Sequence, residues 1–316
     1  METSIIIPVL NDSYVYCCLK SILKSLSGKV PKAKEILVIN DKNSLESFST
    51  KLKLFCKKNK IKYFKSEKPG AAFNRNKGMD LAKGKRILFI DSDCKADKFW
   101  IKEMELSLNS ADIVEGRIDY DSNKTPLFDR VVENKSTSFR FLTANLGITR
   151  KVGKECKFDE RFIVFREDTD FGLMALEKGF KHFFCEKAKV FHKSSRFTIK
   201  RFIFERKRFI GEPLFFKKHR KNALIKKHIP RIWRISHPVE FILLALIIAS
   251  LFFSWKYLIL AYLLSGTVYC LKKYLIDKRT FKIKDTILVL ILLPLTMVVK
   301  RIAIWKGAIR FKFFLL

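Results

Sequence analysis

Short apolar runs alternate with longer amphipathic stretches over roughly the first 195 residues of the chain. Four runs have the length and the β-branched content of buried strands, namely Ser4–Val9, Glu35–Ile39, Ile61–Phe64 and Arg86–Ile90. Between them, apolar side chains recur at helical spacing, first at Leu19, Ile22, Leu23 and Leu26 and then at Leu45, Phe48, Leu52 and Phe55. Strands that are apolar on both faces and separated by single helices are typical of a parallel sheet with helices on each side. The pattern therefore predicts an α/β domain.

Beyond this domain the apolar pattern changes to long runs. Residues 239–253 carry one charge, at Glu240 near their start, and residues 257–271 are also strongly apolar. With its flanks, each run is just long enough to cross about 30 Å of hydrocarbon. We expect transmembrane helices at about 238–254 and 257–273, and a basic loop that returns to the cytoplasm. A third run, Thr286–Val299, has the length of an interfacial or re-entrant segment, and a basic amphipathic tail follows it.

The segment between the α/β domain and the long apolar runs, about residues 198–234, is rich in basic and aromatic residues. It is either a solvated basic face or a segment lying in the membrane interface, with Phe and Trp among the headgroups and cations against anionic lipid. The apolar runs that follow favour the interface. We therefore expect an α/β domain at 1–195, a basic-aromatic interfacial segment at 196–236 and an α-helical membrane region at 237–316.

The composition is strongly basic, with 64 Lys+Arg against 31 Asp+Glu and a formal net charge of +33. This charge predicts an anionic partner. No helix-turn-helix, zinc knuckle or aromatic RNA-binding strand motif occurs in the sequence, so we expect anionic lipid or a phosphorylated substrate rather than nucleic acid. The seven cysteines form no CxxC pair, and no basic n-region precedes the first strand. We expect reduced thiols and a cytoplasmic domain.

Two acidic clusters stand out in so basic a chain. Asp91 and Asp93 follow a predicted strand, where carboxylates at i and i+2 point to the same side and can share Mg²⁺ or Mn²⁺. Turn formation is the common alternative for such aspartates. Glu167, Asp168 and Asp170 precede a helical pattern, so they either cap the helix or supply a base. His192 ends an apolar run and is either structural or a metal or phosphate ligand.

The ordered set of motifs resembles the family 2 glycosyltransferases with the GT-A fold, over roughly residues 3–195. The motifs, in sequence order, are Ser4–Asn11, Glu35–Ser44, Lys68–Ala82, Arg86–Asp93, Asn145–Arg150, Phe158–Phe162, Arg166–Leu173, Lys178–Phe180 and Ala188–His192. The resemblance implies a Rossmann-like nucleotide-diphospho-sugar transferase domain. It also implies a nucleotide-sugar donor and a divalent metal cofactor, Mg²⁺ or Mn²⁺.

The resemblance also implies roles for individual residues. Asp168 is expected to be the general base, with Glu167 positioning the acceptor. Asp91 and Asp93 would be the metal-binding pair, and His192 would touch the metal or the leaving diphosphate. Residues expected to line the nucleotide-sugar site are Pro8, Asn11, Asn40, Asp41, Arg75, Asn76, Asp91 and Ser92.

Sugar transfer builds negative charge on the leaving diphosphate and requires a base for the acceptor hydroxyl. One metal pair and one separate base suggest direct displacement with inversion. The acceptor is expected to be membrane-associated, either a lipid-linked saccharide, a glycan or a polyprenyl phosphate, in surface-glycan assembly. The alternatives are a basic lipid- or nucleic-acid-binding protein and a catalytically inactive anchor.

The chain departs from the family pattern at three points. Asn40-Asp41-Lys42-Asn43-Ser44 replaces Asp-Asp-Gly-Ser, which leaves open the residue that reads the base. Met174 stands where many members have Arg, which weakens the assignment of acceptor orientation. No Gln-x-x-Arg-Trp follows His192, which argues against a processive polysaccharide synthase.

Overall fold

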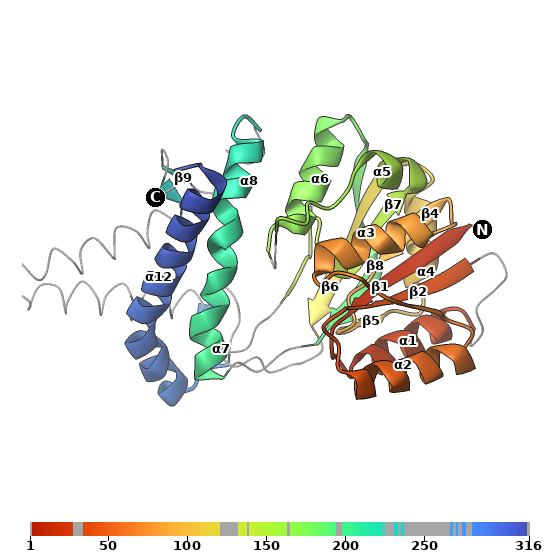
Figure 1. The fold of residues 1–316 in the computed structure, drawn as a ribbon, viewed down its shortest axis with the longest axis horizontal. Coiled ribbons are helices and arrows are strands. Elements are labelled where there is room, and N and C mark those ends of the chain that lie inside the picture. Colours follow the sequence, from red (N-terminus) through yellow and green to blue (C-terminus); the bar gives the residue numbers. More distant parts are fainter. Residues whose placement is uncertain are drawn as a thin grey trace, which may run out of the picture. The chain divides into compact units, whose positions relative to one another are not determined.

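The computed structural model describes residues 2–27, 34–120, 132–137, 139–162, 165–193, 198–222, 224, 231–232, 235–236, 266–267, 270, 274–275 and 280–314. The chain divides into two compact units (Figure 1). The first comprises Met1–Asp121 and Val132–Lys193, and the second comprises Ser122–Val131 and Ser194–Leu316. The first unit carries the predicted site residues.

The first unit contains an eight-stranded sheet in the order β3-β2-β1-β4-β7-β6-β8-β5. One half of it consists of β1 (Thr3–Val9), β2 (Lys34–Asn40), β3 (Lys62–Lys65) and β4 (Arg86–Phe89), all parallel. Every residue of β1 is buried, and so is all of β2 except Lys34. These are the continuous apolar runs of the sequence, and the predicted α/β class is confirmed. Their carboxyl ends meet along one edge, which is where a ligand site is expected.

The other half of the sheet is mixed rather than parallel. It contains β5 (Cys94–Ala96), β6 (Ile113–Tyr120), β7 (Leu146–Thr149) and β8 (His182–His192). β7 pairs antiparallel with both β4 and β6, β8 runs parallel to β6, and β5 pairs antiparallel with β8. The expected all-parallel sheet is therefore wrong for this half. Hydrophobic periodicity shows that a strand is buried but carries no information on its direction.

Helices cover both faces of the sheet (Figure 1). On one face, α1 (Val15–Ser25), α2 (Glu46–Lys58) and α4 (Trp100–Ser107) bury apolar side chains against alternate residues of β1 and β2, such as Ile5 and Val38. On the other face, α3 (Ala71–Leu81) lies so close to β1 that a Cβ on Gly78 would lie 2.5 Å from the Ile6 side chain. The short helices η1 (Thr143–Asn145) and α5 (Arg150–Glu155) flank β7, and α6 (Glu167–Glu177) precedes β8.

The second unit is helical in its described parts. It contains α7 (Ile199–Phe204), η2 (Glu205–Gly211), α8 (Glu212–His219) and α12 (Ile283–Phe311), together with the two-residue strands β9 (Arg231–Ile232) and β10 (Ile235–Ser236). α12 packs along α7, η2 and α8. A Cβ on Gly307 of α12 would lie 2.1 Å from the Ile210 carbonyl oxygen, so only glycine allows this approach.

The basic-aromatic segment requires a correction. Phe202, Phe209, Phe215 and Phe216 are buried inside the second unit and are not available to lipid headgroups, whereas Phe204 is exposed. Their rings supply the apolar partners that η2, α7 and α8 need to pack. Basic side chains cover some of these rings, as Arg206 does Phe202 at 5.6 Å from guanidinium carbon to ring centroid.

The third apolar run lies within α12, a single helix of 29 residues, about 43 Å long. It continues through the basic residues that follow residue 299, and it is longer than the short interfacial segment expected. In the described part of the chain, α12 is the one helix long and apolar enough to cross a membrane, with a mean hydropathy of 2.4 over an 18-residue stretch. The expected helices at 238–254 and 257–273 lie outside the described residues, except for 266–267 and 270.

Candidate active site

The loops after β1 and β2 are fastened to each other and to α3. Asn11 has a positive φ of 49°, and its side-chain oxygen accepts a hydrogen bond from Leu45 N at 2.8 Å. Asp41, 2% exposed, accepts from Asn43 N through Oδ1 and from Gly70 N and Asn74 Nδ2 through Oδ2. Gly70 has a φ of 114°, which favours glycine. Asp41 therefore joins the end of β2 to the start of α3.

Two other predicted nucleotide residues are more deeply placed than the sequence suggests. Pro8 lies inside β1, and Asn40 is fully buried at the end of β2. Asn40 Nδ2 donates to Ser49 Oγ at 2.8 Å and to Tyr63 Oη at 2.9 Å. These contacts give Asn40 a structural role in holding β2 against α2 and β3.

Arg75 connects the two acidic motifs. It projects from α3 with 5% exposure, donating to Asp91 Oδ1 at 3.0 Å and to Glu167 Oε1 at 3.1 Å. Burial lowers the pKa of this guanidinium, but the carboxylates of Asp91, Glu167 and Asp168 outweigh burial and raise it. The residues after β4 and the start of α6, which are 76 positions apart in the sequence (167 − 91), therefore converge on one buried cation.

Asn76, the neighbour of Arg75, points elsewhere. Its side chain exchanges hydrogen bonds with the Phe158 backbone, accepting from N and donating to O at 2.9 Å each. It also donates to Glu160 Oε1 at 3.4 Å. Asn76 thus holds the loop that precedes α6, and the structure does not bring it to Asp91 or Asp93 by any described contact.

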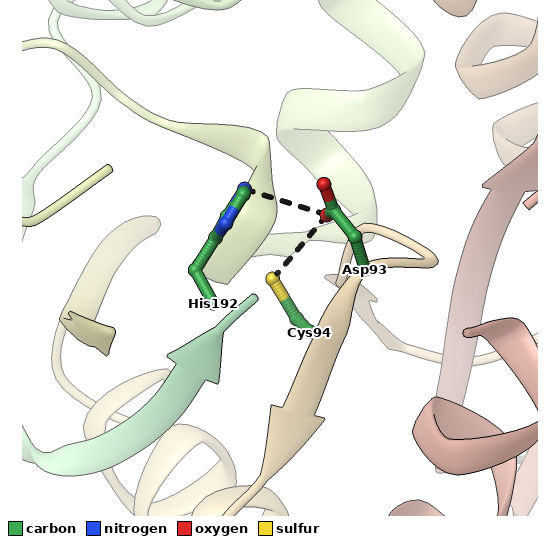
Figure 2. Close-up of side chains that lie close together, drawn as sticks. All are labelled: Asp93, Cys94 and His192. Carbon is green, nitrogen blue, oxygen red and sulfur yellow. Dashed lines mark hydrogen bonds and ion pairs between the residues drawn. The ribbon is translucent and has the colours of Figure 1, made fainter. Parts of the chain in front are cut away.

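Asp93 and His192 meet at the outer end of the sheet, where β5 pairs with β8 (Figure 2). His192 Nε2 lies 3.4 Å from Asp93 Oδ1. Potential ligand atoms of Asp93, Cys94 and His192 all lie within 4.8 Å of one another. Asp93 remains 38% exposed at its side chain, so an ion can reach the group from solvent.

The imidazole of His192 is oriented for metal binding. Its Nδ1 lies 2.9 Å from the Lys193 carbonyl oxygen, an acceptor, so Nδ1 is assigned the proton. Nε2 is then the ring nitrogen that faces the Asp93 carboxylate and would bind a metal ion. Neighbouring ligands of an octahedral Mg²⁺ are about 3 Å apart, since each lies about 2.1 Å from the ion. Asp93 and His192 therefore fit a divalent cation between them.

Cys94 lies close to Asp93 and His192, but its thiol is not suited to bind a hard cation. Burial raises the pKa of its thiol well above the ordinary value, and the carboxylates of Asp93 and Asp91 add to the effect. The protonated Sγ lies 3.9 Å from Asp93 Oδ1 and serves as a weak donor. A thiol is also a poor ligand for hard cations. Asp91, by contrast, is directed to Arg75, and its expected pairing with Asp93 on one cation stays a prediction.

Asp168 and Glu167 occupy the first turn of α6. Asp168 is partly accessible, yet protein atoms surround it densely. This desolvation, together with the nearby charge of Glu167, raises the pKa of Asp168 to about 7, while Arg75 opposes the rise. Glu167 directs Oε1 to Arg75, and its buried Oε2 has no hydrogen-bond partner among the described residues. The pair thus offers a proton acceptor near neutral pH and a carboxylate oxygen available to a donor.

The backbone around this turn is strained. Arg166 just before α6 has a φ of 81°, and Phe139 and Phe141 have φ values of 52° and 51°. The Arg140 carbonyl between these two rings accepts a hydrogen bond from Thr169 Oγ1 at 3.1 Å. Such strain gathers at functional sites because the surroundings must hold it in place. In this unit it surrounds the turn that carries Asp168.

Sequence reasoning missed the residues that tie Ser92 into the site. Ser92 Oγ donates to Asp12 Oδ2 at 3.1 Å, and Asp12 Oδ1 accepts from Tyr14 N at 2.9 Å. The predicted contact of Ser92 with a nucleotide stays a prediction. Asp12, Asp41 and Asp91 each lie within three residues of the end of a buried strand, and that shared position was the signal available in the sequence.

Comparison with known proteins agrees with this architecture. Residues 4–158 match the family described as glycosyl transferase family 2, and residues 101–300 match glycosyl transferase family group 2. An uncharacterised glycosyltransferase of Rickettsia bellii is 40% identical over 108 residues, which are 34% of this chain and 14% of that protein. One of Rickettsia conorii is also 40% identical over 108 residues, 17% of its length. The matched stretch thus spans less than a fifth of either relative.

Solved structures resemble the chain at low sequence identity. Residues 1–349 of TarS from S. aureus align with a TM-score of 0.49 and 18% identity, covering 72% of this chain and 74% of that 1–349 chain. GalNAc-T7, solved with UDP, GalNAc and Mn²⁺, aligns with a TM-score of 0.49 and 17% identity over 62% of this chain and 43% of the GalNAc-T7 chain.

The family assignment rests on the match to glycosyl transferase family group 2. This match covers residues 101–300, which is more than half of the chain. The chain therefore belongs to the family 2 glycosyltransferases.

Proposed function

We propose that this chain transfers a sugar from a nucleotide-diphosphate donor to a hydroxyl of a membrane-associated acceptor, with inversion at the anomeric carbon. The observation that carries the proposal is the double contact of Arg75 with Asp91 and Glu167. It connects the end of β4, beside the Asp93–His192 pair, with the turn that holds Asp168. The loop that carries Asp93 and the turn that carries Asp168 are thereby joined through one side chain, which supports their placement in one site.

Asp93 and His192 would hold a divalent cation. Once bound, the ion would neutralise the charge that develops on the departing diphosphate. Asp91, held by Arg75, would remain available through its second oxygen to the sugar or to a water on the ion. The side chain of Asp91 is 29% exposed, which supports this assignment.

Asp168 would act as the base. Its carboxylate takes the proton of the acceptor hydroxyl while the acceptor oxygen forms a bond to the anomeric carbon. The bond from that carbon to the phosphate oxygen breaks, and its electron pair leaves with the nucleoside diphosphate. A pKa near 7 suits this task because the group is ionised at neutral pH and still basic enough to accept a proton. Glu167 Oε2, buried and unpaired among the described residues, would accept a hydrogen bond from the acceptor.

Membrane attachment is supported by α12. One face of this helix exposes apolar side chains along its whole length, at intervals of three or four residues, while Lys300 and Arg301 are buried against the protein. The exposed residues, which we call the α12 stripe, are Ile283, Ile287, Ile291, Leu295, Val298, Ile302, Trp305 and Ile309. A continuous apolar surface of this kind favours acyl chains as its partner. We propose a cell-membrane location with the first unit on the cytoplasmic side.

The test is a panel of nucleotide sugars incubated with the full-length protein, Mg²⁺ or Mn²⁺ and a membrane extract as acceptor source. We expect release of nucleoside diphosphate and a glycosylated product in the lipid fraction. Asp93→Ala is expected to lose both donor binding and transfer, whereas Asp168→Ala is expected to lose transfer and retain nucleotide binding. Full transfer by either variant would contradict the role assigned to that residue.

A further inference from the structure

Two lysines beside the proposed cation site share one aromatic ring. Lys193 Nζ lies 4.9 Å from the centroid of the Tyr14 ring, and Lys95 Nζ lies 5.4 Å from the same centroid. Lys95 belongs to β5, Lys193 follows β8 directly, and Tyr14 precedes α1. Three segments that are distant in sequence thus bring two ammonium groups to a single ring.

This arrangement is joined to the cation site by the backbone. Lys193 N donates to the Asp93 carbonyl oxygen at 2.9 Å, and its own carbonyl orients His192 Nδ1. Lys95 lies two residues after Asp93, on the same side of the chain. Tyr14 N donates to Asp12, which in turn accepts from Ser92. The lysines therefore lie within the same network as Asp93 and His192.

Two like charges near one another repel, so this placement calls for an explanation. The face of an aromatic ring attracts cations and offsets part of the repulsion. What remains is a positive field beside a site that is proposed to bind a cation as well. Such a concentration of positive charge is suited to a ligand with several negative charges, which a nucleoside diphosphate has and a neutral sugar lacks.

We propose that Lys95 and Lys193, positioned by Tyr14, form a lysine clamp that binds the diphosphate of the donor and stabilises it as it leaves. The proposal rests on the proposed function and adds a second source of positive charge to it. The clamp binds the diphosphate of the donor rather than its nucleobase or its sugar. It therefore distinguishes nucleoside diphosphates from the corresponding monophosphates.

The experiment compares two ligands on the full-length protein in detergent with Mg²⁺. Isothermal titration first identifies which of UDP, GDP, ADP, CDP and dTDP binds, and then measures that diphosphate and its monophosphate. For the double variant Lys95→Ala/Lys193→Ala we expect the diphosphate Kd to rise about tenfold or more. The monophosphate Kd should change less than about twofold. Lys193→Arg should retain most of the diphosphate affinity, because it keeps the charge.

Lys151→Ala provides a matched control, since Lys151 Nζ also lies over an aromatic ring, 5.5 Å from the centroid of Phe180, on α5. It should leave both constants unchanged. A double variant that binds diphosphate like the wild type would overturn the clamp and leave the proposed function standing. Equal loss of both ligands would show that the lysines merely support the loop. A wild type that binds none of the diphosphates would overturn the proposed function, and the clamp with it.

Discussion

Arg75 donates a hydrogen bond of 3.0 Å to Asp91 Oδ1 from one terminal nitrogen of its guanidinium, and the other terminal nitrogen reaches Glu167 at 3.1 Å. A planar fork of this kind positions two carboxylates at a fixed separation. The distance between the cation-binding loop and the base-bearing turn is therefore set by a side chain from a third element, α3. Neither acidic motif can shift without affecting the other.

Replacing Arg75 with lysine should separate these two motifs while keeping the charge. Lysine cannot donate to both carboxylates with the geometry of a guanidinium, so one of them loses its buried partner. We expect transfer to fall at least about tenfold and the free energy of unfolding to fall by up to about 3 kcal/mol. Initial rates and thermal unfolding would measure both. Arg161→Lys is the control and should change neither, because the Arg161 side chain is 60% exposed.

The raised pKa of Asp168 predicts how activity depends on pH. Desolvation and Glu167 raise this pKa to about 7, so the base is increasingly ionised as pH rises through neutrality. We expect kcat/KM to increase between about pH 6 and pH 8 and then to level off. A pH–rate profile with no inflection in that range would contradict the assignment of Asp168 as the base.

The same pKa predicts a stability effect. An aspartate whose pKa is higher in the folded state than in the unfolded state stabilises the fold at low pH. This contribution is lost as the pH rises from the unfolded-state pKa through the folded-state pKa. Asp168→Asn should therefore unfold at a higher temperature than the wild type at pH 8, by at least about 2 °C, although it is inactive. The two proteins should converge below about pH 4. Thermal melts across pH would check this, and Asp80→Asn serves as a surface control, because the Asp80 side chain is 66% exposed.

Cation binding should depend on Asp93 and His192 but not on Cys94. Asp93→Asn and His192→Gln each remove a ligand, so the Kd for Mn²⁺ should rise about tenfold or more in either variant. Cys94→Ser should keep the wild-type value, because its buried thiol stays protonated. Electron paramagnetic resonance of free Mn²⁺ gives the constants. Loss of Mn²⁺ binding in Cys94→Ser would instead make the sulfur a ligand.

The α12 stripe should be protected by lipid. In membrane vesicles, a cysteine at Ile291 is expected to resist a membrane-impermeant maleimide, and it should react after detergent solubilisation. Leu106 lies in α4 of the first unit and is 53% exposed, so Leu106→Cys should be labelled in open vesicles without detergent. The background needs Cys17→Ala, because Cys17 is exposed. Rapid labelling of Ile291→Cys in vesicles would remove the support for lipid contact by this face.

The strands β1, β2 and β4 were predictable because they are buried on both faces. Ile5, Ile6 and Ile7 are all inaccessible, and a run of that kind has few alternatives to a central strand. The short strands β5 and β7 gave no such signal. β5 has three residues and directly follows the acidic motif, so its apolar content is too small to show a period.

The site was predictable in its parts and less so in its connections. Asp91, Asp93, Asp168 and His192 were identified by motif and order, and the structure links Asp91 to Glu167 and Asp93 to His192. The predicted nucleotide contacts of Asn40, Asp41 and Asn76 stay predictions, and the hydrogen bonds that these residues make were not foreseen. Their amides and carboxylate hold loops together through long-range hydrogen bonds, such as that from Asn76 to Phe158. Such partners depend on the folded topology, which a local pattern does not encode.

β5 is the outermost strand of the sheet and only three residues long, yet it begins next to one of the two proposed cation ligands, whereas the other ends β8. An ion held between Asp93 and His192 would therefore also stabilise the pairing of β5 with β8. Removal of the ion by a chelator is expected to weaken the pairing of β5 with β8, so amide hydrogen exchange at residues 94–96 should accelerate. The availability of the metal ion would then determine the local stability of β5 as well as the catalytic activity. In a cell depleted of the ion, the protein would be less rigid at the proposed donor site.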